Sequence, residues 1–183
     1  MSVIVLISGR GENLRSILQS DVSHKISCVI TDNDKANGIK IAKSYNKKIK
    51  IIKYNSLFSD QLLEFLINQK PQLIVLAGFM RILSEKIINE FEGRIINIHP
   101  SLLPKHKGLN THMKVLENKD KFHGCTVHFV DAGIDTGKII AQDKIKVMKT
   151  DDCESLKQKV LDREIKLYPK VIKQLLKDMK LIY

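Results

Sequence analysis

Short apolar runs alternate with amphipathic segments along the first half of the chain, and this alternation constrains the fold more than any other feature. The runs are rich in Val, Ile and Leu and are too short for buried helices, whereas the segments between them repeat apolar residues at helical spacing. The alternation predicts an α/β fold in which helices cover a doubly wound, mostly parallel sheet of the Rossmann-like type. We expect strands at residues 3–7, 26–30, 49–52, 73–77 and 94–99, and helices after the loop 8–13, at 36–45, at 58–69 and from Ser84.

The second half of the chain departs from this alternation. The expected elements are a helix at 111–118, a strand at 124–130, a loop at 131–137 and a strand at 138–147. The two strands and the turn-forming loop between them predict a hairpin. A long amphipathic helix begins near Asp151, and Pro169 is expected to interrupt or kink it. With 183 residues, the chain is expected to fold as one domain over residues 1–183.

The formal net charge of +11 raises the question of a nucleic-acid partner. Nearly all of the excess is lysine spread along the whole chain, and aromatic residues make up only 5% of it. Nucleic-acid binders more often cluster arginine and interleave aromatic rings for base stacking. We therefore expect no nucleic-acid partner, and a basic RNA-binding module is kept as the non-enzymatic alternative.

The sequence shows no signal for a membrane, a disulfide framework or a metal. No apolar stretch approaches the roughly 20 residues that cross a bilayer, and the amino terminus leads directly into the first expected strand. Cys28, Cys125 and Cys153 are widely scattered, which fits a reducing compartment. A cytoplasmic protein without membrane partner or bound metal is expected. The histidines other than His99 do not show the spacing of metal ligands. They are His24, His106, His112, His123 and His128.

Polar side chains stand where the fifth expected strand ends. Side chains two apart in a strand point the same way, so Asn97 and His99 are expected to project together, away from Ile96 and Ile98. Pro100 stops the strand because it lacks a backbone donor. An amide and an imidazole would then lie at the carboxyl edge of the sheet, where open α/β sheets bind ligands. A capped strand end with a structural histidine is the alternative for this pattern alone.

Two glycines follow the first expected strand. Gly9 and Gly11 precede a helix, and backbone amides in such a loop can bind a phosphate with the help of the helix dipole. The spacing matches neither the P-loop nor the full dinucleotide fingerprint. A plain tight turn fits the pattern equally well.

Several longer stretches carry a further signal. They read VLISGRGENL, LAGFMRILS, NIHPSLLPKHKGLNTH, HGCTVHFV and DAGIDTG, followed by YP in the last expected helix. Together, in this order and over nearly the whole chain, they resemble the phosphoribosylglycinamide formyltransferases. The resemblance implies transfer of a formyl group from the co-substrate 10-formyltetrahydrofolate to the amine of glycinamide ribonucleotide, in de novo purine biosynthesis. It also implies that Asn97, His99 and Asp135 form the catalytic group.

These three residue types suit that chemistry. An amine that attacks a formyl carbon forms a tetrahedral intermediate with a negative oxygen, to which the Asn97 amide and a protonated His99 could donate. We expect Asp135 to pair with His99 and to raise the pKa of the imidazole, because a nearby negative charge favours the imidazolium. His99 would then act as an acid. Taken alone, Asp135 is more typical of a turn.

The resemblance also implies a set of binding residues. The substrate phosphate is assigned to the loop with Gly11, Glu12 and Asn13. The folate pterin is assigned to Met80, Arg81, Ile82, Leu83 and Asn97, together with the loop at 130–135. Glu164 matches a carboxylate near the substrate amine, although a glutamate on a helix surface fits the pattern equally well.

Two positions depart from the family pattern. Glu12 stands where the family has a small hydroxyl residue that touches the phosphate, and its charge would repel a dianion unless it turns away. We therefore expect weakened binding of the substrate phosphate. The arginine that some members use for the folate tail has no match near Ser59 and Asp60.

Two other activities fit the same catalytic residues. A 10-formyltetrahydrofolate hydrolase carries the same Asn, His and Asp but uses water, and a formyltransferase that acts on another amine, such as methionyl-tRNA, would suit the positive charge. Those families usually carry an extra domain. The given sequence begins at the first expected strand and ends at Tyr183, which favours glycinamide ribonucleotide as the substrate. The expected oligomeric state is a monomer or a homodimer.

Overall fold

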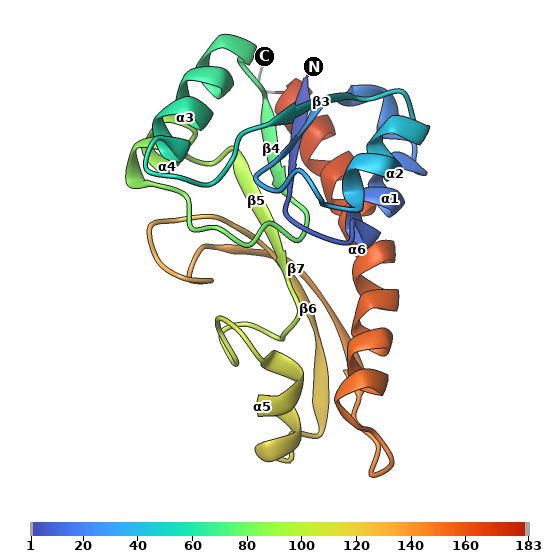
Figure 1. Ribbon diagram of the computed structural model, residues 1–183. Helices are drawn as coiled ribbons and strands as arrows, with labels where there is room; N and C mark the ends of the chain where they lie inside the picture. The colour runs from blue at the N-terminus through green and yellow to red at the C-terminus, as the bar shows by residue number, and fades with distance from the viewer. Residues whose placement is uncertain (1, 182–183) are drawn as a thin grey trace.

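The structure, a computed structural model, describes residues 2–181, which form a seven-stranded sheet in the order β3-β2-β1-β4-β5-β6-β7 (Figure 1). The strands from β1 to β5 pair in parallel, whereas β6 runs antiparallel to both β5 and β7. The predicted α/β fold with a mostly parallel sheet and a late hairpin is confirmed. The strands are β1 (Val3–Ile7), β2 (Ile26–Thr31), β3 (Lys48–Ile51), β4 (Leu73–Leu76), β5 (Ile95–His99), β6 (Phe122–Phe129) and β7 (Ile139–Lys146).

Helices cover both faces of the sheet (Figure 1). Alternate residues of each strand supply the two layers of the core, because successive strand side chains point to opposite faces. Val3 and Val5 pack in the layer under α1, α2 and α6, while Ile4 and Leu6 pack in the layer under α3 and α4. The helices are α1 (Glu12–Leu18), α2 (Gly38–Ser44), α3 (Phe58–Gln69), α4 (Glu85–Glu90), α5 (Thr111–Glu117) and α6 (Cys153–Leu181), with a 3₁₀ turn at Ser23–Lys25.

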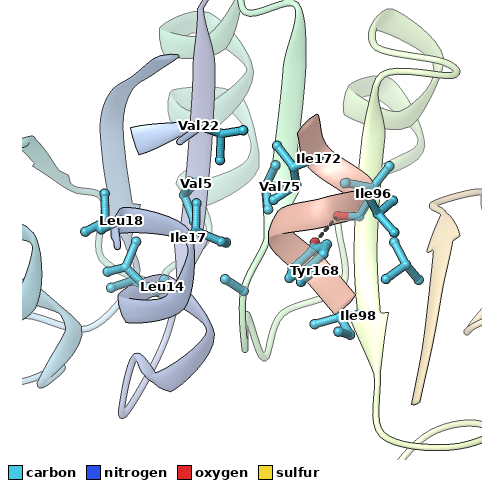
Figure 2. Packing of buried hydrophobic residues seen from close by; sticks show 14 of the residues in the cluster. Val5, Leu14, Ile17, Leu18, Val22, Val75, Ile96, Ile98, Tyr168 and Ile172 are labelled. Atoms are coloured by element: carbon cyan, nitrogen blue, oxygen red, sulfur yellow. Dashed lines mark hydrogen bonds between the residues drawn. The ribbon is translucent and has the colours of Figure 1, made fainter. Parts of the chain in front are cut away.

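The long helix α6 is anchored to the middle of the sheet by Tyr168 (Figure 2). This side chain is fully buried, and its hydroxyl donates to the main-chain oxygens of Leu76, at 2.9 Å, and Ile96, at 3.2 Å. Pro169 lies inside α6, which continues as one helix, so the prediction of an interruption is wrong. A proline removes one backbone hydrogen bond and crowds the preceding turn, but the buried side chains of Tyr168 and Ile172 hold the helix on both sides of it.

The carboxyl ends of the central strands form one edge of the sheet. The chain leaves β1 toward β2 on one side and later returns to β4 on the other side of β1. Open α/β sheets bind ligands at such a switch point. The glycine loop after β1, the segment after β4 and the polar end of β5 all lie at this edge, since these strands are parallel. Among residues 2–181 no helix is long and apolar enough to span a membrane.

Candidate active site

Asn97 and His99 leave β5 on the same face of the sheet, as the period of the strand predicts. Ile96 and Ile98 point the other way, into the core layer that contains α6. His99 is buried and Asn97 is half-buried. The strand thus holds an amide and an imidazole side by side at its carboxyl end.

The loop between β6 and β7 brings Asp135 onto this pair. Asp135 has a φ of 51°, in the left-handed region that aspartate adopts more readily than most residues. Its Oδ2 accepts a hydrogen bond from the Gly108 amide at 2.9 Å and lies 3.2 Å from Nδ1 of His99. The structure therefore brings together the residues that the resemblance implied to be catalytic.

His128 completes the group, whereas the sequence raises a place in the pocket for it but favours a packing or surface role. It lies opposite Asn97 in the register of β5 and β6, and its Nε2 is 3.4 Å from the Asn97 amide nitrogen and 3.5 Å from Oδ1 of Asp135. Nδ1 of His128 lies 2.8 Å from the main-chain oxygen of Phe129, which can only accept a hydrogen bond, so this nitrogen carries a proton. The signal that could have found His128 is the antiparallel pairing of the hairpin with the catalytic strand.

Both ring nitrogens of His99 face oxygen atoms. Nε2 lies 2.9 Å from the main-chain oxygen of His106, and Nδ1 faces Asp135. Both contacts are hydrogen bonds only when each nitrogen carries a proton. Burial nevertheless lowers the pKa of His99, and the His106 oxygen and the Asp135 carboxylate offset only part of this effect. Asp135 thus acts on the pKa of His99 in the predicted direction, but the net change is a decrease, because desolvation outweighs the attraction. The ring therefore holds its second proton weakly.

The carboxyl group of Asp135 stays ionised beside these rings. Burial alone would raise its pKa, but the contact with His128 and the hydrogen bond from Gly108 lower it below its usual range. The Asp135 carboxylate thus faces one ring nitrogen of His99 and one of His128. The other nitrogen of each ring is directed at a main-chain oxygen. The two rings and the carboxylate therefore form one connected group at the end of β5.

The glycine loop is packed against the start of α2. Gly11 has a φ of 84°, and a Cβ atom built on it would lie 2.8 Å from Cα of Gly38. The Gly38 amide donates to the Gly9 oxygen at 3.1 Å. Only glycine combines this backbone conformation with so close an approach.

Asn13 joins the glycine loop to α6. Its Nδ2 donates to Oε2 of Glu164 at 2.8 Å, across the space between α1 and α6. Glu164 is buried, which excludes the alternative of a glutamate on the helix surface. Burial raises the pKa of Glu164 to about 7, and the nearby charge of Glu12 adds to the effect. The carboxyl group therefore keeps its proton to a higher pH than an exposed glutamate does.

Glu12 is turned toward an arginine of its own loop. Its Oε2 lies 3.5 Å from Nε of Arg10, whose side chain is largely exposed, while that of Glu12 is partly exposed. An exposed pair is worth little in stability. The pair does place a positive charge beside Glu12. This charge reduces the repulsion between Glu12 and a bound phosphate, which the sequence predicts.

The segment at residues 80–83 presents apolar side chains at the edge of the sheet. Met80 is 64% and Ile82 is 78% exposed, whereas Leu83 is 5% exposed and belongs to the core layer under α3 and α4. Nε of Arg81 donates to Oδ2 of Asp32 at 2.5 Å. Exposed apolar side chains at the edge of the sheet suit one face of a flat heteroaromatic ring.

The model of the formyl transferase family matches residues 1–172. The chain belongs to the formyl transferase family. The phosphoribosylglycinamide formyltransferase of Haemophilus influenzae is 39% identical over 180 residues, which cover 93% of this chain and 85% of that protein. The Escherichia coli protein of the same name is 36% identical over 181 residues, with 94% and 85% covered. A solved phosphoribosylglycinamide formyltransferase from Anaplasma phagocytophilum has a TM-score of 0.92 at 39% identity, and the match covers 97% of this chain and 88% of that one.

In this formyl transferase the predicted residues fall into three neighbouring groups. Asn97, His99 and Asp135 meet at the end of β5, together with His128. The glycine loop and Glu164 meet between α1 and α6 through Asn13. The segment at 80–83 follows β4, between these two groups in the strand order. Over the described chain, residues 2–181, no group of three or more side chains is placed to hold a metal.

Proposed function

We propose that this formyl transferase moves the formyl group of 10-formyltetrahydrofolate to the amine of glycinamide ribonucleotide, in de novo purine biosynthesis. The observation that carries the proposal is the contact of His99 and His128 with one carboxylate, Asp135, beside the Asn97 amide. The names of the relatives, which are phosphoribosylglycinamide formyltransferases, support the choice of acceptor. The family itself implies a folate-type formyl donor.

The amide of Asn97 is proposed to donate to the formyl oxygen as it becomes negative. Loss of one such donor typically costs about 10²- to 10³-fold in rate. The attacking amine must lose a proton, and the leaving nitrogen of the folate must gain one. A group that holds one proton between His99, His128 and Asp135 can give a proton to the leaving nitrogen and take one from the amine. The low pKa of His99 favours donation, because the imidazolium is then a stronger acid.

The substrate phosphate is proposed to bind at the glycine loop. The first backbone amides of α1, which begins after Gly11, have no acceptor within the helix. Glu12 weakens the site, although Arg10 offsets part of its charge. Glu164 is proposed to lie near the substrate amine. A carboxyl group with a pKa of about 7 can accept a proton from an ammonium group or donate a hydrogen bond to a neutral amine.

The folate ring is proposed to bind against Met80, Ile82 and the backbone of Arg81 and Leu83, close to Asn97. The exposed apolar side chains fit one face of a flat ring. We further propose that residues 1–183 act as one domain in the cytoplasm, as a monomer or homodimer, without metal or nucleic acid.

The test measures tetrahydrofolate release from 10-formyltetrahydrofolate with and without glycinamide ribonucleotide, and His99→Ala serves as the blank. Release that requires the amine substrate supports the transferase. Release in its absence would show a 10-formyltetrahydrofolate hydrolase instead, and transfer only to another amine would show a different acceptor. No release above the blank would refute an activity at this site.

A further inference from the structure

Arg81 lies in the segment proposed to bind the folate ring, yet its side chain is not free to reach a ligand. Nε donates to Oδ2 of Asp32 at 2.5 Å, and the guanidinium carbon lies 4.2 Å from the centre of the Tyr54 ring. The Arg81 side chain is 39% exposed, whereas that of Asp32 is fully buried. The guanidinium group is therefore held between a buried carboxylate and an aromatic face.

The buried carboxylate makes this pair a strong constraint. Oδ1 of Asp32 has no hydrogen-bond partner among the residues that the structure describes, so Arg81 is the cation that compensates its charge. Separating the pair would leave an unpaired charge inside the protein, which is far more costly than separating an exposed pair. Stacking on Tyr54 adds a cation–π attraction. Arg81 is thus fixed much more firmly than its exposure suggests.

Two further contacts fix the same short segment. The Met80 amide donates to Oγ of Ser8 at 3.0 Å, and Leu83 is anchored in the core. Ser8 follows β1, and its main-chain oxygen accepts a hydrogen bond from Asn33 at 3.2 Å. The loops after β1, β2 and β4 are therefore tied together at the edge where the ligands are proposed to bind.

We infer that Asp32 and Arg81 form a positioning pair for the folate site, an inference that rests on the proposed function. Asp32 holds the Arg81 side chain away from the ligand, and this sets the backbone of residues 80–83 and the direction of Met80 and Ile82. Neither side chain of the pair touches the reacting atoms. The Arg81 side chain is accordingly not the group that replaces the missing arginine for the folate tail.

The test compares Asp32→Asn, Arg81→Gln and the double variant, with Asp34→Asn as the matched control. Asp34 lies in the same loop, but its partner Lys53 is an exposed side chain at 3.0 Å. Because the pair acts as a unit, each single variant is expected to raise the KM for the folate by about 10-fold or more. The double variant should be no worse than either single one, and the KM for glycinamide ribonucleotide should stay within about 2-fold of the parent value. Asp34→Asn should leave every constant unchanged.

A donor that lacks the glutamate tail separates positioning from direct contact. A positioning pair predicts the same increase in KM with the tailless donor. Loss of the effect with that donor, or an effect of Arg81→Gln without one of Asp32→Asn, would overturn the inference in favour of direct tail binding. An equal loss for both substrates with a lowered melting temperature would overturn it in favour of a general structural role. Unchanged constants in all variants would also overturn it.

Calorimetric binding of tetrahydrofolate gives a readout that does not depend on formyl transfer. If the parent binds tetrahydrofolate but transfers no formyl group, the proposed function fails while the weaker binding expected of Asp32→Asn and Arg81→Gln still tests the pair. If the parent does not bind tetrahydrofolate, the inference fails together with the folate site.

Discussion

Replacing Gly11 with alanine tests how tightly the glycine loop is built. The added Cβ would lie 2.8 Å from Cα of Gly38 and 3.0 Å from Cδ1 of Ile41. Gly38 cannot easily move away, because its amide is bonded to the Gly9 oxygen. The left-handed conformation costs a non-glycine residue about 1–2 kcal/mol, and overpacking adds roughly 1–3 kcal/mol. We expect Gly11→Ala to lower the free energy of unfolding by about 2–5 kcal/mol.

Gly93→Ala is the matched control for this prediction. Gly93 has a φ of 68°, but an added Cβ would meet no atom within 4 Å, so its variant carries the conformational cost alone. Urea unfolding of both variants gives the difference in free energy of unfolding that the close approach to α2 causes. A higher KM for glycinamide ribonucleotide in Gly11→Ala alone would locate the effect at the glycine loop. Equal destabilisation by the two substitutions would refute the argument.

Three more predictions concern the ionisable groups of the site. Glu12→Ser is expected to lower the KM for glycinamide ribonucleotide, since it removes a negative charge from the proposed phosphate loop, and an unchanged KM would show that Glu12 does not face the phosphate. Burial raises the pKa of Glu164 from 4.5 to about 7, so between these pH values the folded state binds a proton that the unfolded state has lost. The free energy of unfolding should therefore fall by about 3 kcal/mol as the pH rises through this window. Unfolding curves of Glu164→Gln should lack this decrease, and a parallel decrease in both proteins would contradict the assignment. His128→Gln is expected to lower kcat by about 10-fold or more with little change in either KM, because it removes one of the groups between which the proton is proposed to move. Steady-state kinetics that show a change in KM alone would instead assign His128 to binding.

The sequence alone predicted the fold because its strong signals are local. Apolar runs and helical periodicity located the strands within a few residues, and the period of the strand placed Asn97 and His99 on one face. Asp135 entered only through the resemblance, because nothing local distinguishes it from a turn residue. Its contact with His99 depends on a loop folding back over β5.

The remaining features depend on contacts between distant segments. His128 joins the site only through the pairing of β6 with β5, and Asp32 meets Arg81 across 49 positions of sequence. The sequence shows the charged neighbour that raises the pKa of His99 but not the burial that lowers it by more, so the net change is opposite to the predicted one. Glu164 stayed undecided for the same reason, since burial separates the two interpretations of its position.

The most direct test of the proposed chemistry is single-turnover formation of formylated glycinamide ribonucleotide by the parent and by Asp135→Asn. Asparagine keeps the shape of the side chain but cannot stay negative beside the two rings. We predict a loss of at least about 10²-fold in the rate of transfer at saturating donor. A variant that transfers the formyl group at the parent rate would contradict a catalytic role for the shared proton and for the site built around it.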